Sequence, residues 1–161
     1  MGQVLSTPRK YQCINRAAPY ESYQFPLMQH YFKTIDCMAA YSNTLGVIPA
    51  NEVINSQPST IAAPVVRAVT RDVKRYMALA HGISGQRQLP VGYSSADVIM
   101  YLRQSFDYFT AGDPDEALDF FCVSLGWIEL HSTADKLQIF SSIATVGRAK
   151  PPCPSQATIG S

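Results

Sequence analysis

Hydrophobic positions along the chain switch between two spacings, which predicts helices and strands in turn. In the segment 23–42, apolar side chains recur every three or four residues, as on one face of a helix. The same spacing runs from about residue 58 to a predicted helix end at His81-Gly82, and a third helix is expected over 96–110. The first two apolar stripes consist of Leu27, Tyr31, Ile35, Met38 and Tyr41, and of Ile61, Val65, Val69, Val73 and Met77.

Short apolar runs separate these helices and predict buried strands. They read LGVIPA at 45–50, LPVGYSS at 89–95 and ALDFFCVSLGW at 117–127, and GQVLSTP at 2–8 supplies one more. Strands that are apolar on both faces and alternate with helices are typical of a parallel sheet with right-handed crossovers. The sequence therefore predicts an α/β fold.

Composition limits the kinds of protein that this chain can be. Its 161 residues are 47% hydrophobic and 16% charged, which suits one globular domain, expected here over 1–131. The segment 132–161 ends in a stretch rich in Pro, Ser and Gly and is predicted to be a disordered tail. A net charge of +1, without a long run of like charge, argues against nucleic acid as a partner.

The sequence shows no membrane-spanning stretch, no signal peptide and no metal-binding pattern. It contains no stretch of 18 apolar residues, and 1–10 lacks the apolar core of a signal peptide. We therefore expect neither a membrane span nor secretion from the chain as written. Its four cysteines, Cys13, Cys37, Cys122 and Cys153, form no CxxC or Cys/His pattern, so no metal site and no cofactor are predicted.

Asn51 and Glu52 stand directly after a predicted buried strand. In parallel α/β folds, side chains that do chemistry gather at the carboxyl ends of the strands. A helix cap or a solvated turn would produce the same two residues, so the local pattern alone leaves both interpretations open. Glu52 is nevertheless the first candidate for a catalytic residue.

A longer block around this pair resembles a known family. The block LGVIPANEVINSQPSTIAAPVVRAVTRDVKRY, followed by LPVGYSSADV, is similar to the fungal 1,3-β-glucanosyltransferases. These glycolipid-anchored cell-wall enzymes cut and rejoin β-1,3-glucan chains. LSTPRKYQCINRAAP and DYFTAGDPDEALDFFCVSLGW extend the resemblance to about residues 4–127. It implies a partial (β/α)8 TIM barrel, from about the third to the sixth strand.

The resemblance implies a retaining double displacement, which needs two carboxyl groups about 5 Å apart. Glu52 matches the family's acid/base, and Asn51 matches the amide that hydrogen-bonds the 2-hydroxyl of the reacting sugar. A second glucan chain, rather than water, would resolve the covalent intermediate. The implied partner is therefore a β-1,3-glucan chain, at a cell surface to which the family is held by a lipid anchor.

Six further positions are carried over as substrate-binding candidates, namely Tyr11, Asn15, Arg16, Tyr93, Asp97 and Arg103. The first three fall in a loop that lines the sugar groove in the family. Arg103 stands one residue later than the family's arginine, whose place is taken by Leu102. Two plainer roles stay open: the aromatics Tyr11, Tyr93 and Trp127 could be core or groove-wall residues, and Asp97 could be a helix N-cap.

Departures from the family pattern are also present. Pro49 and Ala50 stand where the family has Ala-Gly, and a proline inside a central strand removes a ladder hydrogen bond, so a distorted strand is expected. The family's nucleophile lies in a Ser-Glu-Tyr-Gly context that the sequence does not contain, and Glu129 in WIELHS is no match. We therefore expect a truncated, inactive form of the enzyme; the alternative is a glucan-binding or protein-interaction remnant.

Overall fold

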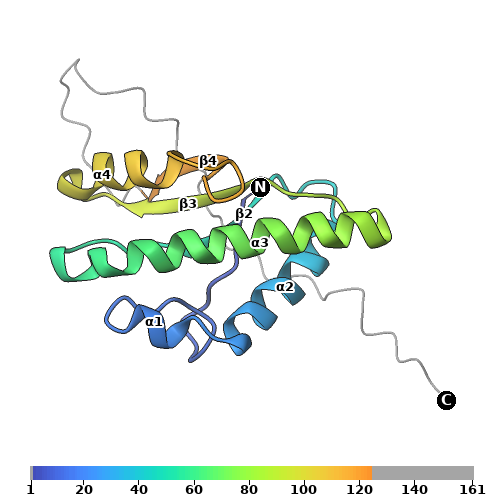
Figure 1. The fold of residues 1–161 in the computed structure, drawn as a ribbon, viewed down its shortest axis with the longest axis horizontal. Coiled ribbons are helices and arrows are strands. Elements are labelled where there is room, and N and C mark those ends of the chain that lie inside the picture. Colours follow the sequence, from blue (N-terminus) through green and yellow to red (C-terminus); the bar gives the residue numbers. More distant parts are fainter. Residues whose placement is uncertain (1, 125–161) are drawn as a thin grey trace.

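The computed structural model describes residues 2–124, which form one four-stranded parallel sheet covered by helices (Figure 1). The strands are β1 (Gly2–Val4), β2 (Gly46–Asn51), β3 (Val91–Ala96) and β4 (Phe120–Ser124), and they lie side by side in chain order. The predicted parallel α/β arrangement is confirmed. Trp127, Glu129 and the predicted tail at 132–161 lie outside the described residues.

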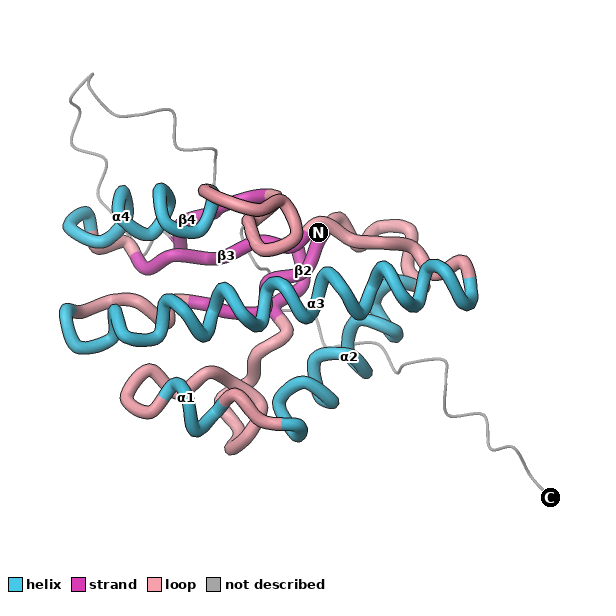
Figure 2. Tube along the Cα trace, in the orientation of Figure 1, coloured by secondary structure: helices cyan, strands magenta, loops and turns pink. Residues whose placement is uncertain are grey.

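A helical crossover joins each strand to the next. The short α1 (Pro19–Ser22) and α2 (Phe25–Ala39) follow β1, the 3-10 helix η1 (Gln57–Ala62) and α3 (Ala63–Ser84) follow β2, and α4 (Ile99–Thr110) follows β3. Because every crossover moves one strand in the same direction, the helices share one face of the sheet. Figure 2 shows α3 in front of the strands, between α2 and α4.

The core lies between the helices and the two central strands. Every residue of β3, and all of β2 except Asn51, is buried, so these strands are enclosed on both faces as the apolar runs predicted. One hydrophobic cluster runs from Leu5 to Leu118 and includes the predicted helix stripes at Leu27, Tyr31 and Ile35 and at Val65, Val69, Val73 and Met77. Three predicted stripe residues are not in this cluster. Met38 is only partly buried, Tyr41 follows the end of α2, and Ile61 falls in η1 and is 51% exposed.

Several element boundaries differ from the prediction. α3 continues past Gly82 to Ser84, because the residue that stops it is Gly85, which has φ +70° and donates its N–H to the His81 carbonyl. α4 begins at Ile99 rather than 96, since Ala96 still pairs in β3. β4 begins at Phe120 rather than 117, because a turn closed on the Asp113 carbonyl precedes it.

Two arginines tie loops to the main chain of distant segments. Arg67 on α3 donates to the carbonyls of Tyr108 and Ala111, which fixes the segment after α4. Arg87 donates to the carbonyls of Tyr41 and Ser42, just before β2. Such bonds satisfy main-chain acceptors that the helices and strands leave unpaired. No helix among residues 2–124 is long and apolar enough to cross a bilayer.

Candidate functional site

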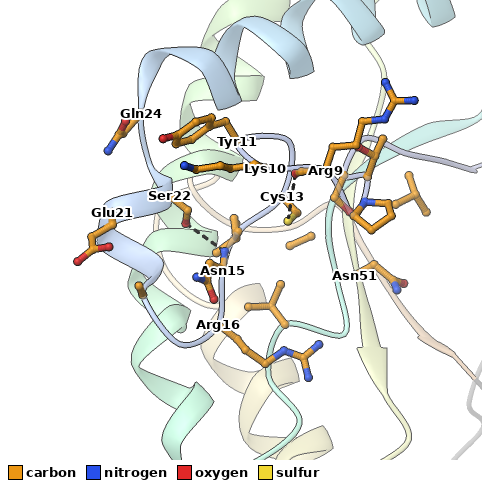
Figure 3. A pocket seen from close by; sticks show the side chains of 18 residues that line it. Arg9, Lys10, Tyr11, Cys13, Asn15, Arg16, Glu21, Ser22, Gln24 and Asn51 are labelled. Atoms are coloured by element: carbon orange, nitrogen blue, oxygen red, sulfur yellow. Dashed lines mark hydrogen bonds between the residues drawn. The ribbon is translucent and has the colours of Figure 1, made fainter.

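A groove of about 910 Å³ opens at the carboxyl ends of β1 and β2. Its walls come from the loop after β1, from α1 and from the end of β2. In Figure 3, Glu21 and Gln24 lie on one side of this groove and Asn51 on the other, with Cys13 and Asn15 between them. A groove at this end of a parallel sheet is where ligands bind in α/β folds.

Asn51 stands at the edge of this groove, and Glu52 follows it in the chain but is not among the residues that line the groove. Asn51 is the last residue of β2, is exposed and lines the groove, and it pairs in register with Ser94 of β3. Glu52 is partly exposed and has φ +51°, a left-handed conformation that only Tyr11 shares among the non-glycine residues described. The Glu52 N–H donates to the Ser94 carbonyl at 2.7 Å. Non-glycine residues held in this region cluster at functional sites.

Pro49 distorts β2 just before this pair, as expected. Val47 pairs with Val91 but Ala50 pairs with Tyr93, so β2 carries one extra residue over this stretch, which is a bulge. Proline has no N–H to donate, and the Pro49 carbonyl accepts a hydrogen bond from the buried Tyr31 hydroxyl at 2.7 Å. Burial raises the pKa of Tyr31, so this hydroxyl stays protonated and remains a donor.

Three predicted site residues, Tyr11, Asn15 and Arg16, line the groove. Tyr11 has φ +62° and is 44% exposed, and the Lys10 ammonium lies 4.8 Å from the centre of its ring. The Asn15 side-chain oxygen accepts the Ala17 N–H at 3.0 Å, and its main-chain N–H donates to Ser22 Oγ at 3.1 Å. Both bonds are made within the segment after β1, so they stabilise the conformation of this loop.

Arg16 connects this loop to the candidate acid. Its Nη2 donates to the main-chain carbonyl of Glu52 at 2.9 Å, across 36 residues of sequence. Tyr11, Asn15, Arg16 and Asn51 therefore line the same groove, and the bond from Arg16 links this lining to the main chain of Glu52.

Tyr93 lies in the core and not among the residues that line the groove. Its side chain is fully buried in β3, and its hydroxyl accepts the Ile54 N–H at 3.0 Å. Burial, with a smaller contribution from the negative charge of Glu52, raises the pKa of Tyr93 to about 12. Of the alternatives left open for this tyrosine, the core position is the one observed.

Asp97 and Arg103 do not join the groove. Asp97 is exposed after β3, and the residue at the N-cap of α4 is Val98, so the capping role left open for Asp97 is not observed. Arg103 lies on α4, and its Nε donates to Asp107 one turn later at 2.8 Å. Its side chain is 72% exposed. An exposed pair of this kind contributes little to stability.

Sequence reasoning missed two basic residues of the groove, Arg9 and Lys10. The available signal was the position of both residues inside the predicted loop after the first strand. Among the residues described, no three His, Cys, Asp or Glu side chains gather as a metal site would require.

Comparison with known proteins identifies a matching family model and relatives that are glucanosyltransferases. The glucanosyltransferase family model matches residues 3–135. The 1,3-beta-glucanosyltransferase gel1 of Aspergillus fumigatus is 46% identical over 117 residues, which are 73% of this chain and 25% of that protein. The 1,3-beta-glucanosyltransferase gas4 of Schizosaccharomyces pombe is 43% identical over 112 residues, or 70% of this chain and 24% of that protein.

A solved structure of Saccharomyces cerevisiae Gas2p in complex with laminaritriose and laminaritetraose superposes with a TM-score of 0.68 at 35% identity. The likeness covers 77% of this chain and 26% of that one. The predicted fold class, a partial (β/α)8 barrel, is thereby confirmed. This chain spans about a quarter of the length of the curated relatives that it matches.

Proposed function

Because this chain belongs to the glucanosyltransferase family, as the match over residues 3–135 shows, we propose that its groove binds β-1,3-linked glucan. One observation carries this proposal: the groove at the carboxyl ends of β1 and β2 is bordered by Asn51, directly before Glu52. A β-glucan is neutral, so its recognition needs hydrogen-bonding groups and an aromatic surface rather than an ion or a cofactor. Asn51, Asn15 and the exposed ring of Tyr11 supply both.

Glu52 has the role of acid/base in this proposal. In the first step its carboxyl group protonates the oxygen of the departing glucan segment, while a second carboxylate attacks the anomeric carbon. In the second step Glu52 takes the proton from the hydroxyl of an incoming glucan chain, which attacks the glycosyl-enzyme intermediate. Asn51 holds the 2-hydroxyl of the reacting sugar, and this contact strengthens toward the transition state.

The 161-residue chain by itself is proposed to bind glucan without transferring it. The second carboxylate of the family stands in a Ser-Glu-Tyr-Gly context, and this sequence contains no such segment. Without that group the covalent intermediate does not form, whatever the geometry around Glu52. Family membership also supports a location at the fungal cell surface, which fractionation of cell walls with a tagged chain would test; recovery only in the cytosol would contradict it.

The test is calorimetric titration of the purified chain with laminarihexaose, and with cellohexaose as the β-1,4-linked control. We expect binding of the first sugar only, and Asn51→Ala should weaken it about tenfold, the loss of one hydrogen bond of ~1.4 kcal/mol. Chromatography of the same mixtures should show no new chain lengths. Equal binding of both sugars, or none of either, would refute a β-1,3-glucan groove.

Glu52→Gln separates the acid/base role from a non-catalytic binding module. Where the carboxyl group touches the reacting sugar, the amide should change the affinity for laminarihexaose measurably, because one oxygen acceptor becomes a donor. An unchanged affinity would favour a glucan-binding module that has no catalytic ancestry at this residue.

The second candidate function is protein interaction through the sheet edges. In the described part of the chain, β1 and β4 each have a strand neighbour on one side only. Unpaired strand edges are templates for pairing with another chain. Sedimentation over a hundredfold concentration range tests this idea, and a monomer at every concentration would argue against pairing between copies.

A further inference from the structure

The turn formed by Glu52, Val53 and Ile54 has a main-chain conformation that its own sequence does not favour. Glu52 has φ +51°, where the side chain of an L-residue crowds the following carbonyl. Such a conformation persists only where surrounding contacts hold it. The contacts that hold this turn are therefore part of what positions the Glu52 carboxyl group.

Three hydrogen bonds hold the turn from three directions. The Glu52 N–H is bound by the Ser94 carbonyl of β3, and the Ile54 N–H by the buried Tyr93 hydroxyl. Arg16 binds the Glu52 carbonyl from the loop after β1. Two of these partners belong to β3, which the sheet itself fixes, whereas Arg16 reaches the turn from a separate segment.

We propose that Arg16 is a positioning residue for Glu52, in that its guanidinium fixes the peptide group after Glu52 and thereby keeps this residue left-handed. This inference rests on the proposed function for the acid/base role of Glu52. The bond goes to a neutral main-chain oxygen, so what it fixes is the direction of a peptide plane. Arg16 also lines the groove, so this one side chain both forms part of the groove wall and bonds the main chain of Glu52.

The charges of the site support this arrangement. The negative charge of Glu52 and the positive charge of Arg16 act on the Tyr93 hydroxyl in opposite directions, so both groups lie within electrostatic reach of it. Arg16 is exposed at the groove, whereas Tyr93 is fully buried behind the turn. The turn is thus held between a buried hydroxyl and an exposed guanidinium.

The test is NMR of the full chain with Arg16→Ala, Arg16→Lys and the control Arg87→Ala. A left-handed residue brings its own N–H and Hα unusually close, so Glu52 should show a strong intraresidue cross-peak in the unaltered protein. Arg16→Ala should reduce this cross-peak at least twofold, and Arg16→Lys should restore part of it, because an ammonium can donate one such bond. Arg87→Ala removes the same kind of bond before β2 and should leave the cross-peak unchanged.

An undiminished cross-peak in Arg16→Ala would overturn the proposal, and so would an equal loss in Arg87→Ala. The signal is read without sugar, so it does not depend on the proposed function. Laminarihexaose titration of the same variants provides the second measurement, with an affinity at least fivefold lower for Arg16→Ala and intermediate for Arg16→Lys. Failure of the unaltered chain to bind the sugar would refute the proposed function while leaving the NMR result intact.

Discussion

At the scale of single residues, the site depends on main-chain geometry as much as on side-chain identity. Glu52 adopts φ +51°, a region that glycine occupies freely and other residues occupy at a cost. A carboxylate is kept there although a glycine would be more stable. Residues in such conformations cluster at functional sites, which is consistent with the acid/base role proposed for Glu52.

The strain at Glu52 leads to a prediction about stability. Glu52→Gly should have a free energy of unfolding about 1 kcal/mol higher than Glu52→Ala, because only alanine has a Cβ to crowd the left-handed backbone. Urea unfolding of the two variants measures the difference. At Asn51, in β2 with negative φ, the order should reverse, with the alanine variant the more stable. The same order at both positions would contradict a strained Glu52.

The raised pKa of Tyr93 leads to a prediction about stability in alkaline solution. Its folded pKa of about 12 lies above the ordinary tyrosine value of 10.0, so its contribution is complete below pH 10 and is lost as the pH rises toward 12. On the order of 2 kcal/mol should be lost over that interval from this side chain. Urea titrations between pH 8 and pH 11.5 measure the free energy of unfolding at each pH. It should decline less for Tyr93→Phe than for the unaltered chain. Equal declines in the two proteins would show that other groups cause the alkaline loss of stability.

At the scale of elements, the sheet is closely packed against the Phe120 side chain of β4, the edge strand that pairs with β3. Gly92 of β3 pairs with Phe120 of β4, and a Cβ at Gly92 would overlap the Phe120 ring. Gly46 of β2 meets the same ring, with 2.8 Å to its built Cβ. The phenyl ring therefore lies over two glycines of adjacent strands.

Gly92→Ala should consequently destabilise the sheet by about 2 kcal/mol, since the added methyl group forces the ring to move. In the double variant with Phe120→Leu, the cost of the alanine should fall to less than half, because the flat ring that it meets is gone. Gly82→Ala is the control, since nothing lies within 4 Å of its built Cβ. Equal costs with and without Phe120 would show that the ring is not the obstacle.

At the scale of the whole molecule, one apolar cluster connects all the crossovers. It includes residues from α2, α3, α4 and both central strands, with Leu27, Val69, Val91 and Phe109 among its most enclosed members. From a single cluster of this extent we expect the described residues to unfold as one cooperative unit.

Leu27→Ala should therefore shift the unfolding of the entire described region. The side chain is fully buried on α2, and its truncation should cost 2–5 kcal/mol, as is typical of leucine in a core. Within each protein, far- and near-ultraviolet circular dichroism should report one common urea midpoint, and this midpoint should be lower in Leu27→Ala than in the unaltered chain. Separate midpoints would show that α2 unfolds independently of the sheet.

Local pattern in the sequence determined the elements and their order. Hydrophobic periodicity depends on neighbours a few residues apart, so it predicted α2, α3, the two buried strands and the parallel sheet. It also placed Asn51 and Glu52 at a strand end, and the surrounding block identified the family. Boundaries were less well determined, as at Gly85, because either of two nearby glycines could have stopped α3.

Only the tertiary structure decided how the site is held together. The bond from Arg16 to Glu52 spans 36 residues and that from Ile54 to Tyr93 spans 39, so neither leaves a periodic signal in the sequence. For the same reason, the sequence could not distinguish the buried Tyr93 from the exposed Tyr11. Residue type and order determine which groups are available for chemistry, whereas packing between distant segments decides which of them meet, because those contacts exist only once the sheet and its loops have come together.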